Sequence, residues 1–382
     1  MSVYQEIVGQ TRAIKTLLLA PENMTHAWLF TGPPGSGRSN LAKAFAASLI
    51  CPSKGCGTCT DCTTALLGTH PDFEIFAPQG VSITVDEIRE LVSRSAWGAS
   101  IAPWRITIIE DCDRMTESAA NALLKALEEP AERTLWLLCA PSTDEVLPTI
   151  RSRCRLISLS TPTTTDVADF LKKNLGISDD QALLASTISQ GHVGRAKYYA
   201  TDRETLALRR TIINLFLSIK DEASAIAVAS KILDIASTRA ELRNEDRNEK
   251  EEEELRTTIQ GPGKSLLSGG SRALKELEKS QKSRTTRTIR DELDTYFIWL
   301  QTQVRDALLS PADLTAKAVN PDLLKELQQL QDRLTFGNLK LLSSHIEQYR
   351  STLESNAAQL LALEAFLFDL LKLQSGHQHP IS

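Results

Sequence analysis

Residues 32–39 read GPPGSGRS, which is one residue away from the phosphate-binding pattern G-x-x-x-x-G-K-[ST]. Glycines let backbone N–H groups converge on phosphate oxygens, and a helix that begins after them adds partial positive charge. Ser39 stands where a hydroxyl holds Mg²⁺, whereas Arg38 stands where the pattern has lysine. The residues that would surround a nucleotide here are Gly32, Pro33, Pro34, Gly35, Ser36, Gly37, Arg38 and Ser39.

Arg38 keeps the positive charge of the usual lysine but changes its shape. Lysine is a compact, flexible point charge that reaches the β- and γ-phosphates, whereas a guanidinium is planar and bulkier. We therefore expect a loop that can bind ATP with Mg²⁺ but hydrolyses it poorly. A glycine-rich turn without any ligand is the alternative.

An acidic pair, Glu110 and Asp111, follows a β-branched run at residues 105–109. A carboxylate pair at such a strand end holds Mg²⁺ and polarises the attacking water, usually in the order Asp then Glu. The order is reversed in this chain. Because positioning dominates phosphoryl transfer, a displacement of about 1 Å can cost on the order of 100-fold in rate. The pair therefore also predicts impaired hydrolysis, unless it is only a solvated strand end.

Four cysteines are clustered directly after the glycine-rich loop and its helix: Cys51, Cys56, Cys59 and Cys62. Four soft thiolates suit tetrahedral Zn²⁺, and a site with four protein ligands is structural because it leaves no position for water. The chain has seven cysteines, and an odd count with one dense cluster fits a reduced compartment and a metal better than a disulfide framework. A redox pair and a loop without metal are the alternatives.

Alternating strands and helices must position these residues in the first 160 residues. Short apolar runs predict strands at 26–32, 105–111, 134–140 and 154–160. Helical patterns separate them at 39–50, 85–96 and 117–129, the second opened by a capping box and the third by Thr116. This alternation implies a parallel sheet covered by helices on both faces.

After residue 160 the strand runs end. The pattern predicts short helices over residues 165–199 and an almost entirely helical region from about residue 203. Within that region, residues 239–290 carry a run of four glutamates at 251–254, the loop-like sequence GPGKSLLSGGS at 261–271, and many Lys and Arg. A solvated helical extension broken by a flexible loop explains this composition, and a partner-binding arm is the alternative.

The overall composition is that of a globular chain: 382 residues, 42% hydrophobic and 24% charged, which suggests about two to three domains. The net charge of −5 gives no global field that attracts nucleic acid, so a DNA contact would be local or shared with partners. No secretory signal is evident, and no apolar run reaches the length of about 18 residues that spans a membrane. We expect a cytoplasmic protein without a membrane segment.

Two further motifs narrow the class: NALLKALEEP at residues 121–130 and IRSRC at 150–154. With IVGQ at residues 7–10 and the cysteine cluster, they closely resemble the bacterial clamp-loader subunits of the AAA+ superfamily, the γ/τ and δ′ subunits of DNA polymerase III. The resemblance is specific over residues 1–160 and extends to about residue 200. It implies an α/β AAA+ P-loop nucleotide-binding domain at 1–160 with a zinc knuckle at 51–62, a small helical lid at 161–202, and an all-α collar at 203–382 that contains the charged insertion at 239–290.

Within this family the chain is most similar to the δ′ subunits. The γ/τ motors carry lysine in the phosphate loop, Asp-Glu at the second strand and a threonine-rich sensor after the third, where this chain has residues 140–142 reading APS. Arg195, in GHVGRA at residues 191–196, is similar to the second sensor arginine but is offset by one place. The resemblance implies a subunit with weak or absent ATPase and no polymerase activity of its own, so its status as an enzyme stays open.

Arg153 lies in the SRC motif that survives intact. In the family this arginine projects into the ATP site of the neighbouring subunit, where a guanidinium supplied in trans neutralises charge that develops on the γ-phosphate. An ordinary loop arginine is the alternative. The resemblance implies γ/τ and δ as partners, with contact to the sliding clamp and primed DNA through the complex.

Two other functions compete with this interpretation. One is a catalytically active γ/τ-like clamp-loader ATPase whose Arg38 tolerates hydrolysis. The other is a zinc-dependent nucleic-acid-binding protein that touches DNA through its knuckle. The knuckle sequence CPSKGCGTCTDC has one lysine and no aromatic residue, which is a poor surface for phosphates or stacked bases.

Overall fold

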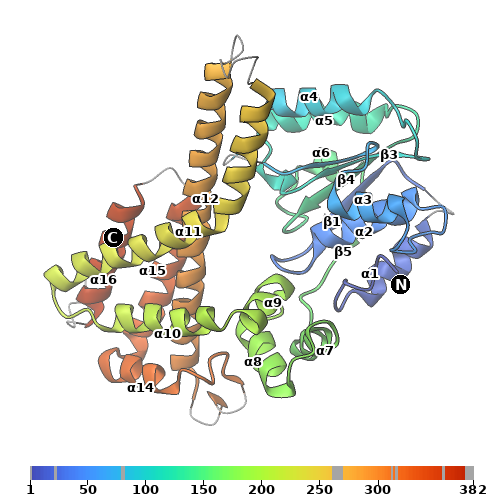
Figure 1. Cartoon of the computed structure of the whole chain (residues 1–382). Coiled ribbons are helices and arrows are strands. Elements are labelled where there is room, and N and C mark those ends of the chain that lie inside the picture. The colour runs from blue at the N-terminus through green and yellow to red at the C-terminus, as the bar shows by residue number, and fades with distance from the viewer. Residues whose placement is uncertain are drawn as a thin grey trace. The chain divides into compact units, whose positions relative to one another are not determined.

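The computed structural model describes residues 2–20, 24–78, 82–259, 270–310, 313–314, 317–354 and 358–374. The chain forms two compact units, Met1–Arg203 and Glu204–Ser382 (Figure 1). The first unit contains a sheet flanked by helices, and the described part of the second consists of helices and the segments that connect them. No helix in the described part of the chain has the length and apolar character needed to cross a membrane.

Five parallel strands form the sheet, in the order β2-β3-β4-β1-β5. All residues of the neighbouring strands β1 and β4 are buried, as expected for central strands covered on both faces. The sequence predicted four of the strands and missed the edge strand β2, whose four residues FEIF are too short to show a pattern. The strands are β1 (Ala27–Thr31), β2 (Phe73–Phe76), β3 (Arg105–Ile109), β4 (Thr134–Ala140) and β5 (Arg155–Ser158).

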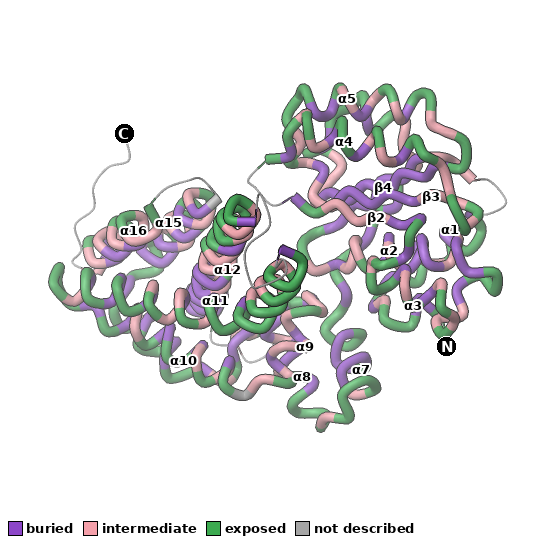
Figure 2. Tube along the Cα trace, turned by 45° about the horizontal axis from the view of Figure 1, so that its top comes forward, coloured by how far each residue is buried: buried purple, intermediate pink, exposed green. Residues whose placement is uncertain are grey.

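Helices cover both faces of the sheet, which makes three layers (Figure 2). Alternate residues of β1 point to opposite faces: Trp28 and Phe30 pack with the first helical layer, whereas Leu29 packs with the second. Trp28 meets Phe45 edge to face at 5.1 Å between ring centroids. The first layer consists of α1 (Thr11–Leu18), α2 (Arg38–Ile50) and α3 (Thr60–Leu67), and the second of α4 (Val85–Ser95), α5 (Glu117–Glu128) and α6 (Pro148–Arg151).

The predicted helix starts are confirmed by their caps. Thr84 opens α4 by accepting a hydrogen bond from the Glu87 N–H, and the Glu87 carboxylate accepts one from the Thr84 N–H in return. Thr116 opens α5 by accepting from the Ala119 N–H. Each cap satisfies backbone donors that have no partner within the helix, which fixes where the helix begins.

A buried carboxylate holds the loop between α4 and β3. Asp72 accepts backbone N–H bonds from Ser100 at 2.6 Å, Ile101 at 2.7 Å and Ala102 at 2.8 Å. Burial alone would raise the pKa of Asp72, but these three bonds lower it below its ordinary value. The charged form of Asp72 therefore stabilises the folded chain.

We expect Asp72→Asn to lower the free energy of unfolding by about 2–4 kcal/mol, because an amide cannot accept all three bonds and turns an N–H group toward other donors. The folded pKa lies below the unfolded one, so this contribution is complete above about pH 4 and is lost as the pH falls through the folded pKa. Urea unfolding between pH 3 and 7 measures it. The difference between the wild type and Asp72→Asn must shrink toward acid pH; a difference independent of pH would contradict this account.

Three short helices follow β5 within the first unit: α7 (Thr164–Leu175), α8 (Asp179–Ser189) and α9 (Val193–Thr201). Thr163 and Asp166 form a capping box at the start of α7, and Ser178 caps α8. His192 caps α9 through its ring nitrogen, since Nδ1 accepts the Arg195 N–H at 3.3 Å. We call these three helices the lid.

The second unit is built on two helices of 38 residues each, α11 (Glu222–Ile259) and α12 (Gly270–Ala307). Phe216, Phe297, Tyr349 and Phe366 form its aromatic centre, with ring centroids 4.0–6.2 Å apart. The fully buried guanidinium of Arg209 is paired with Asp322 at 2.8 Å. The other helices are α10 (Arg203–Leu217), α14 (Leu324–Arg333), α15 (Phe336–Glu354) and α16 (Gln359–Gln374).

The charged insertion predicted at 239–290 is helical wherever it is described, as the ends of α11 and α12. The two helices run antiparallel, because Arg239 pairs with Glu292 and, further along α11, Glu251 pairs with Arg284. Polar bonds therefore line the contact between these helices. The loop predicted at 261–271 lies outside the described residues except for its last two positions, which begin α12.

Candidate functional site

The glycine-rich loop connects β1 to α2, the setting in which phosphate loops work. Gly35 and Gly37 have φ values of 84° and 88°, in the left-handed region that glycine adopts at little cost. Gln10 fastens the loop from outside, since its Nε2 donates to the Ser36 carbonyl at 3.2 Å and to the Ser160 carbonyl at 2.7 Å. The loop is therefore tied to the segment that leads from β5 into the lid.

Arg38 bonds to groups of its own chain. Its Nη1 donates to the Gly32 carbonyl at 2.7 Å, and its Nη2 donates to Asp111 Oδ1 at 3.1 Å. Glu110 pairs with Lys43 at 3.3 Å. The predicted loop and acidic pair thus lie together, but their charges already neutralise one another, and a bound phosphate would have to compete with both Arg38 bonds.

His192 lies directly on the phosphate loop, although no motif in the sequence analysis named it as a site residue. A Cβ placed on Gly35 would stand 2.3 Å from Cγ of the His192 ring. Burial and the nearby charge of Arg195 lower the pKa of His192 to about 4, so the ring is neutral at physiological pH. Arg195 itself is in the first turn of α9, three residues after His192. The sequence signal for this contact was a histidine that directly follows Gly191 and stands two positions before Gly194.

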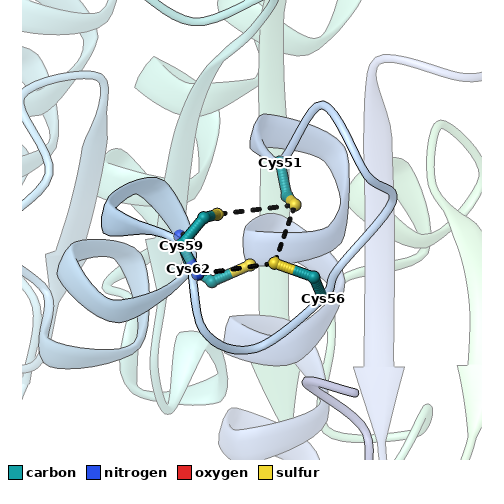
Figure 3. Close-up of side chains that lie close together, drawn as sticks. All are labelled: Cys51, Cys56, Cys59 and Cys62. Atoms are coloured by element: carbon teal, nitrogen blue, oxygen red, sulfur yellow. Dashed lines mark hydrogen bonds between the residues drawn. The ribbon is translucent and has the colours of Figure 1, made fainter. Parts of the chain in front are cut away.

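The four clustered cysteines point their sulfur atoms toward one another (Figure 3). The Cys51 Sγ lies 3.8 Å from the Cys56 Sγ and 3.6 Å from the Cys59 Sγ, and all four ligand atoms lie within 4.8 Å of one another. Tetrahedral ligands at Zn–S bonds of about 2.3 Å would be about 3.8 Å apart. The cluster of Cys51, Cys56, Cys59 and Cys62 can therefore hold a metal ion of this size.

Backbone N–H groups donate to sulfur atoms of the cluster, although burial raises the pKa of Cys62 above its ordinary value. Gly57 donates to the Cys62 Sγ at 3.3 Å and Cys62 donates to the Cys59 Sγ at 3.4 Å. Backbone bonds from Thr58 and Cys59 lower the pKa of Cys56 to about 6. A metal-binding cysteine must be deprotonated, so these donors suit the chemistry of a metal ligand.

The cysteine cluster also supports the N-terminal segment. The Val3 N–H donates to the Gly55 carbonyl at 3.1 Å, and the Tyr4 hydroxyl is bonded to Ser48 Oγ at 3.0 Å. Cys51 and Cys62 belong to the hydrophobic cluster between the sheet and its first helical layer. A metal here would hold both the loop at 51–62 and the start of the chain.

Arg153 and the phosphate loop lie at opposite ends of the strands. β1 and β5 are parallel, with Trp28 beside Arg155, so residues before β5 lie where β1 begins, whereas the loop follows where β1 ends. The two ends of β1, a strand of five residues, are about 13 Å apart. The Arg153 side chain is 34% exposed, donates to the Thr149 carbonyl at 2.7 Å and pairs with Glu128. It therefore cannot serve the loop of its own chain.

An open groove of about 580 Å³ lies beside Arg153. The Arg155 guanidinium, which also borders it, lies 4.8 Å from the centroid of the Trp28 ring. The lining residues of the groove are Met24, Thr25, His26, Trp104, Ser152, Arg153, Cys154 and Arg155.

Comparison with known proteins supports the family resemblance. The family model described as DNA polymerase III, delta subunit, matches residues 9–163, and the model for the C-terminal part of that subunit matches residues 276–372. Curated relatives named DNA polymerase III subunit delta′ match at 30–39% identity. The chain is similar to the delta′ subunits of DNA polymerase III. The resemblance seen in the sequence is thereby confirmed.

Three relatives show how far the match extends. The delta′ subunit of Escherichia coli (strain K12) is 35% identical over 177 residues, which cover 45% of this chain and 53% of that protein. The delta′ subunit of Bacillus subtilis (strain 168) is 30% identical over 212 residues, 54% of this chain and 64% of that protein. The tau subunit of the same organism is 29% identical over 179 residues, 44% of this chain and 31% of that protein. The chain thus spans about half the length of the delta′ relatives it matches.

In this delta′-like chain, the residues predicted from sequence fall into three places. The loop, Glu110, Asp111 and the start of α9 with Arg195 surround one end of the sheet. The cysteine cluster follows α2 on the first helical layer. Arg153 stands apart from both, at the other end of the strands.

Proposed function

We propose that this chain is the delta′ subunit of the DNA polymerase III clamp loader, and that it supplies Arg153 to the ATP site of a neighbouring γ/τ subunit. With γ/τ and δ it would help to place the sliding clamp on primed DNA in the cytoplasm. The observation that carries the proposal is the position of Arg153. Arg153 is partly exposed and lies at the end of the strands away from its own phosphate loop. Its guanidinium can therefore contribute to phosphoryl transfer only in another subunit.

The chain's own nucleotide site supports a stator-like role. Arg38 is engaged by Gly32 and Asp111, and Glu110 is engaged by Lys43, so none of these charges is presented to a ligand. A catalytically active γ/τ-like motor would require both contacts to be exchanged for phosphate and Mg²⁺. We therefore propose that ATP hydrolysis by this chain is weak or absent, and that the cysteine cluster holds a structural Zn²⁺.

Assembly tests the partner claim directly. A tagged full-length chain is mixed with the γ/τ and δ subunits of the same organism and analysed by size-exclusion chromatography with light scattering. We expect a stable complex of defined mass that contains all three subunit types, and no complex with an unrelated AAA+ protein as the control. Failure to co-elute with γ/τ, although γ/τ and δ associate with each other, would contradict the proposed function.

A further inference from the structure

The His192 ring occupies a space beside Gly35 and Gly194, where neither residue has a side chain. Its Cγ, Cδ2 and Cβ atoms lie 2.3, 2.5 and 2.7 Å from the position that a Cβ on Gly35 would take, closer than real Cβ atoms come to their neighbours. On the other side, a Cβ on Gly194 would stand 3.3 Å from Cε1 of the same ring. The imidazole thus lies between the phosphate loop and the first turn of α9.

The surrounding backbone is packed just as closely. A Cβ on Gly191 would stand 2.5 Å from the Pro162 carbonyl oxygen, and one on Gly9 would stand 3.1 Å from Pro162. Gln10, next to Gly9, bonds both the Ser36 and the Ser160 carbonyls. The lid, the segment after β5 and the phosphate loop are therefore held together, with His192 as the lid side chain that packs on Gly35 of the loop.

From this geometry we propose that His192 is the residue that closes the phosphate loop of this chain and excludes nucleoside triphosphate, with the Arg38 contacts to Gly32 and Asp111 completing the closed state. The inference rests on the proposed function, because it explains how one subunit of an ATP-driven assembly keeps its own site silent. It adds a residue that the phosphate-loop pattern does not contain. Release of the ring is then the step that nucleotide binding would require.

His192 has two separable roles, and this makes the inference testable. Its Nδ1 caps α9 by accepting the Arg195 N–H, while its ring packs on Gly35. Serine is an equally good N-cap residue but lacks the Cγ and Cδ2 atoms that pack on Gly35. His192→Ser therefore removes most of the contact with the loop and keeps the cap, whereas His192→Ala removes both.

The experiment uses the isolated chain, with Arg38→Lys as the background because it restores the lysine of the pattern and removes the guanidinium that bonds both Gly32 and Asp111. A fluorescent ATP analogue with Mg²⁺ is titrated and its anisotropy is measured. We expect Arg38→Lys/His192→Ser to bind at least tenfold more tightly than Arg38→Lys alone. Without nucleotide, we expect the amides of residues 35–39 to exchange with deuterium at least tenfold faster in His192→Ser than in the wild type.

Lys197→Ala is the matched control, because it breaks the exposed pair between the lid and Glu6 without touching the loop. It should leave both measurements unchanged. The inference is overturned if His192→Ser behaves like the wild type, if only His192→Ala opens the loop, or if Lys197→Ala opens it equally. Each of these results would leave the partner role of Arg153 untouched, and a failure of the chain to assemble with γ/τ would leave the His192 result standing.

Discussion

Replacing Arg153 with alanine is expected to reduce the DNA-dependent ATPase rate of a reconstituted clamp loader by about 10³-fold, the lower end of what a trans arginine contributes in such enzymes. The side chain is partly exposed, and its partners are Glu128 and the Thr149 carbonyl. Water can take the place of both contacts. Removing the side chain should therefore leave the stability of the chain within about 1 kcal/mol of the wild type. The substitution therefore lowers the rate of ATP hydrolysis in the neighbouring subunit and leaves the fold of this chain intact.

Two further variants make this result specific. Arg153→Lys keeps a positive charge but not the planar fork that binds two oxygens at once, so only a small part of the rate should return. Arg151→Ala removes a nearby exposed arginine that is paired with Asp144 at 3.7 Å, and it should leave the rate unchanged. Assembly of each variant is checked by co-elution before its ATPase is measured. An Arg153→Ala loader that assembles and hydrolyses ATP at the wild-type rate would remove the basis of the proposed function.

Local patterns in the sequence were sufficient to predict most of the first unit. The strand–glycine–helix order placed the phosphate loop, and the Thr84–Glu87 box fixed the start of α4, because each depends on residues close together in the chain. The cysteine spacing likewise predicted a cluster that the structure brings within 4.8 Å. These features are determined by sequence-local geometry, which a single sequence displays directly.

Contacts between distant segments could not be predicted in the same way. The ring of His192 reaches Gly35 only because the lid packs on the sheet domain, and nothing adjacent to His192 in sequence indicates this. The bond from Arg38 to Asp111 joins residues 73 positions apart and changes an apparent phosphate ligand into an internal contact. The short strand β2 is likewise defined by its pairing with β3 rather than by its own composition. Resemblance to a family suggested the role proposed for Arg153, which its local sequence does not indicate.

The second large effect is expected at the cysteine cluster. The purified chain should contain one Zn²⁺, and Cys59→Ser should lose it, because three thiolates leave the tetrahedral site incomplete. Cys59 is also the N-cap of α3, where its sulfur accepts the Cys62 N–H. Serine is a good N-cap residue, so the substitution preserves the helix start and isolates the loss of metal.

Loss of the ion should destabilise the whole first unit, because Cys51 and Cys62 are part of its hydrophobic core and Val3 is bonded to Gly55 in the same loop. With free zinc about 1,000-fold above the dissociation constant, bound metal stabilises the folded state by about 4 kcal/mol. We expect Cys59→Ser to show a lower melting temperature that no longer responds to a chelator, and faster deuterium exchange at the Val3 amide. Cys154→Ser, outside the cluster, should keep its metal and its response to the chelator. A wild-type chain that contains no metal, and whose melting temperature a chelator does not change, would show that the four thiols pack together without an ion.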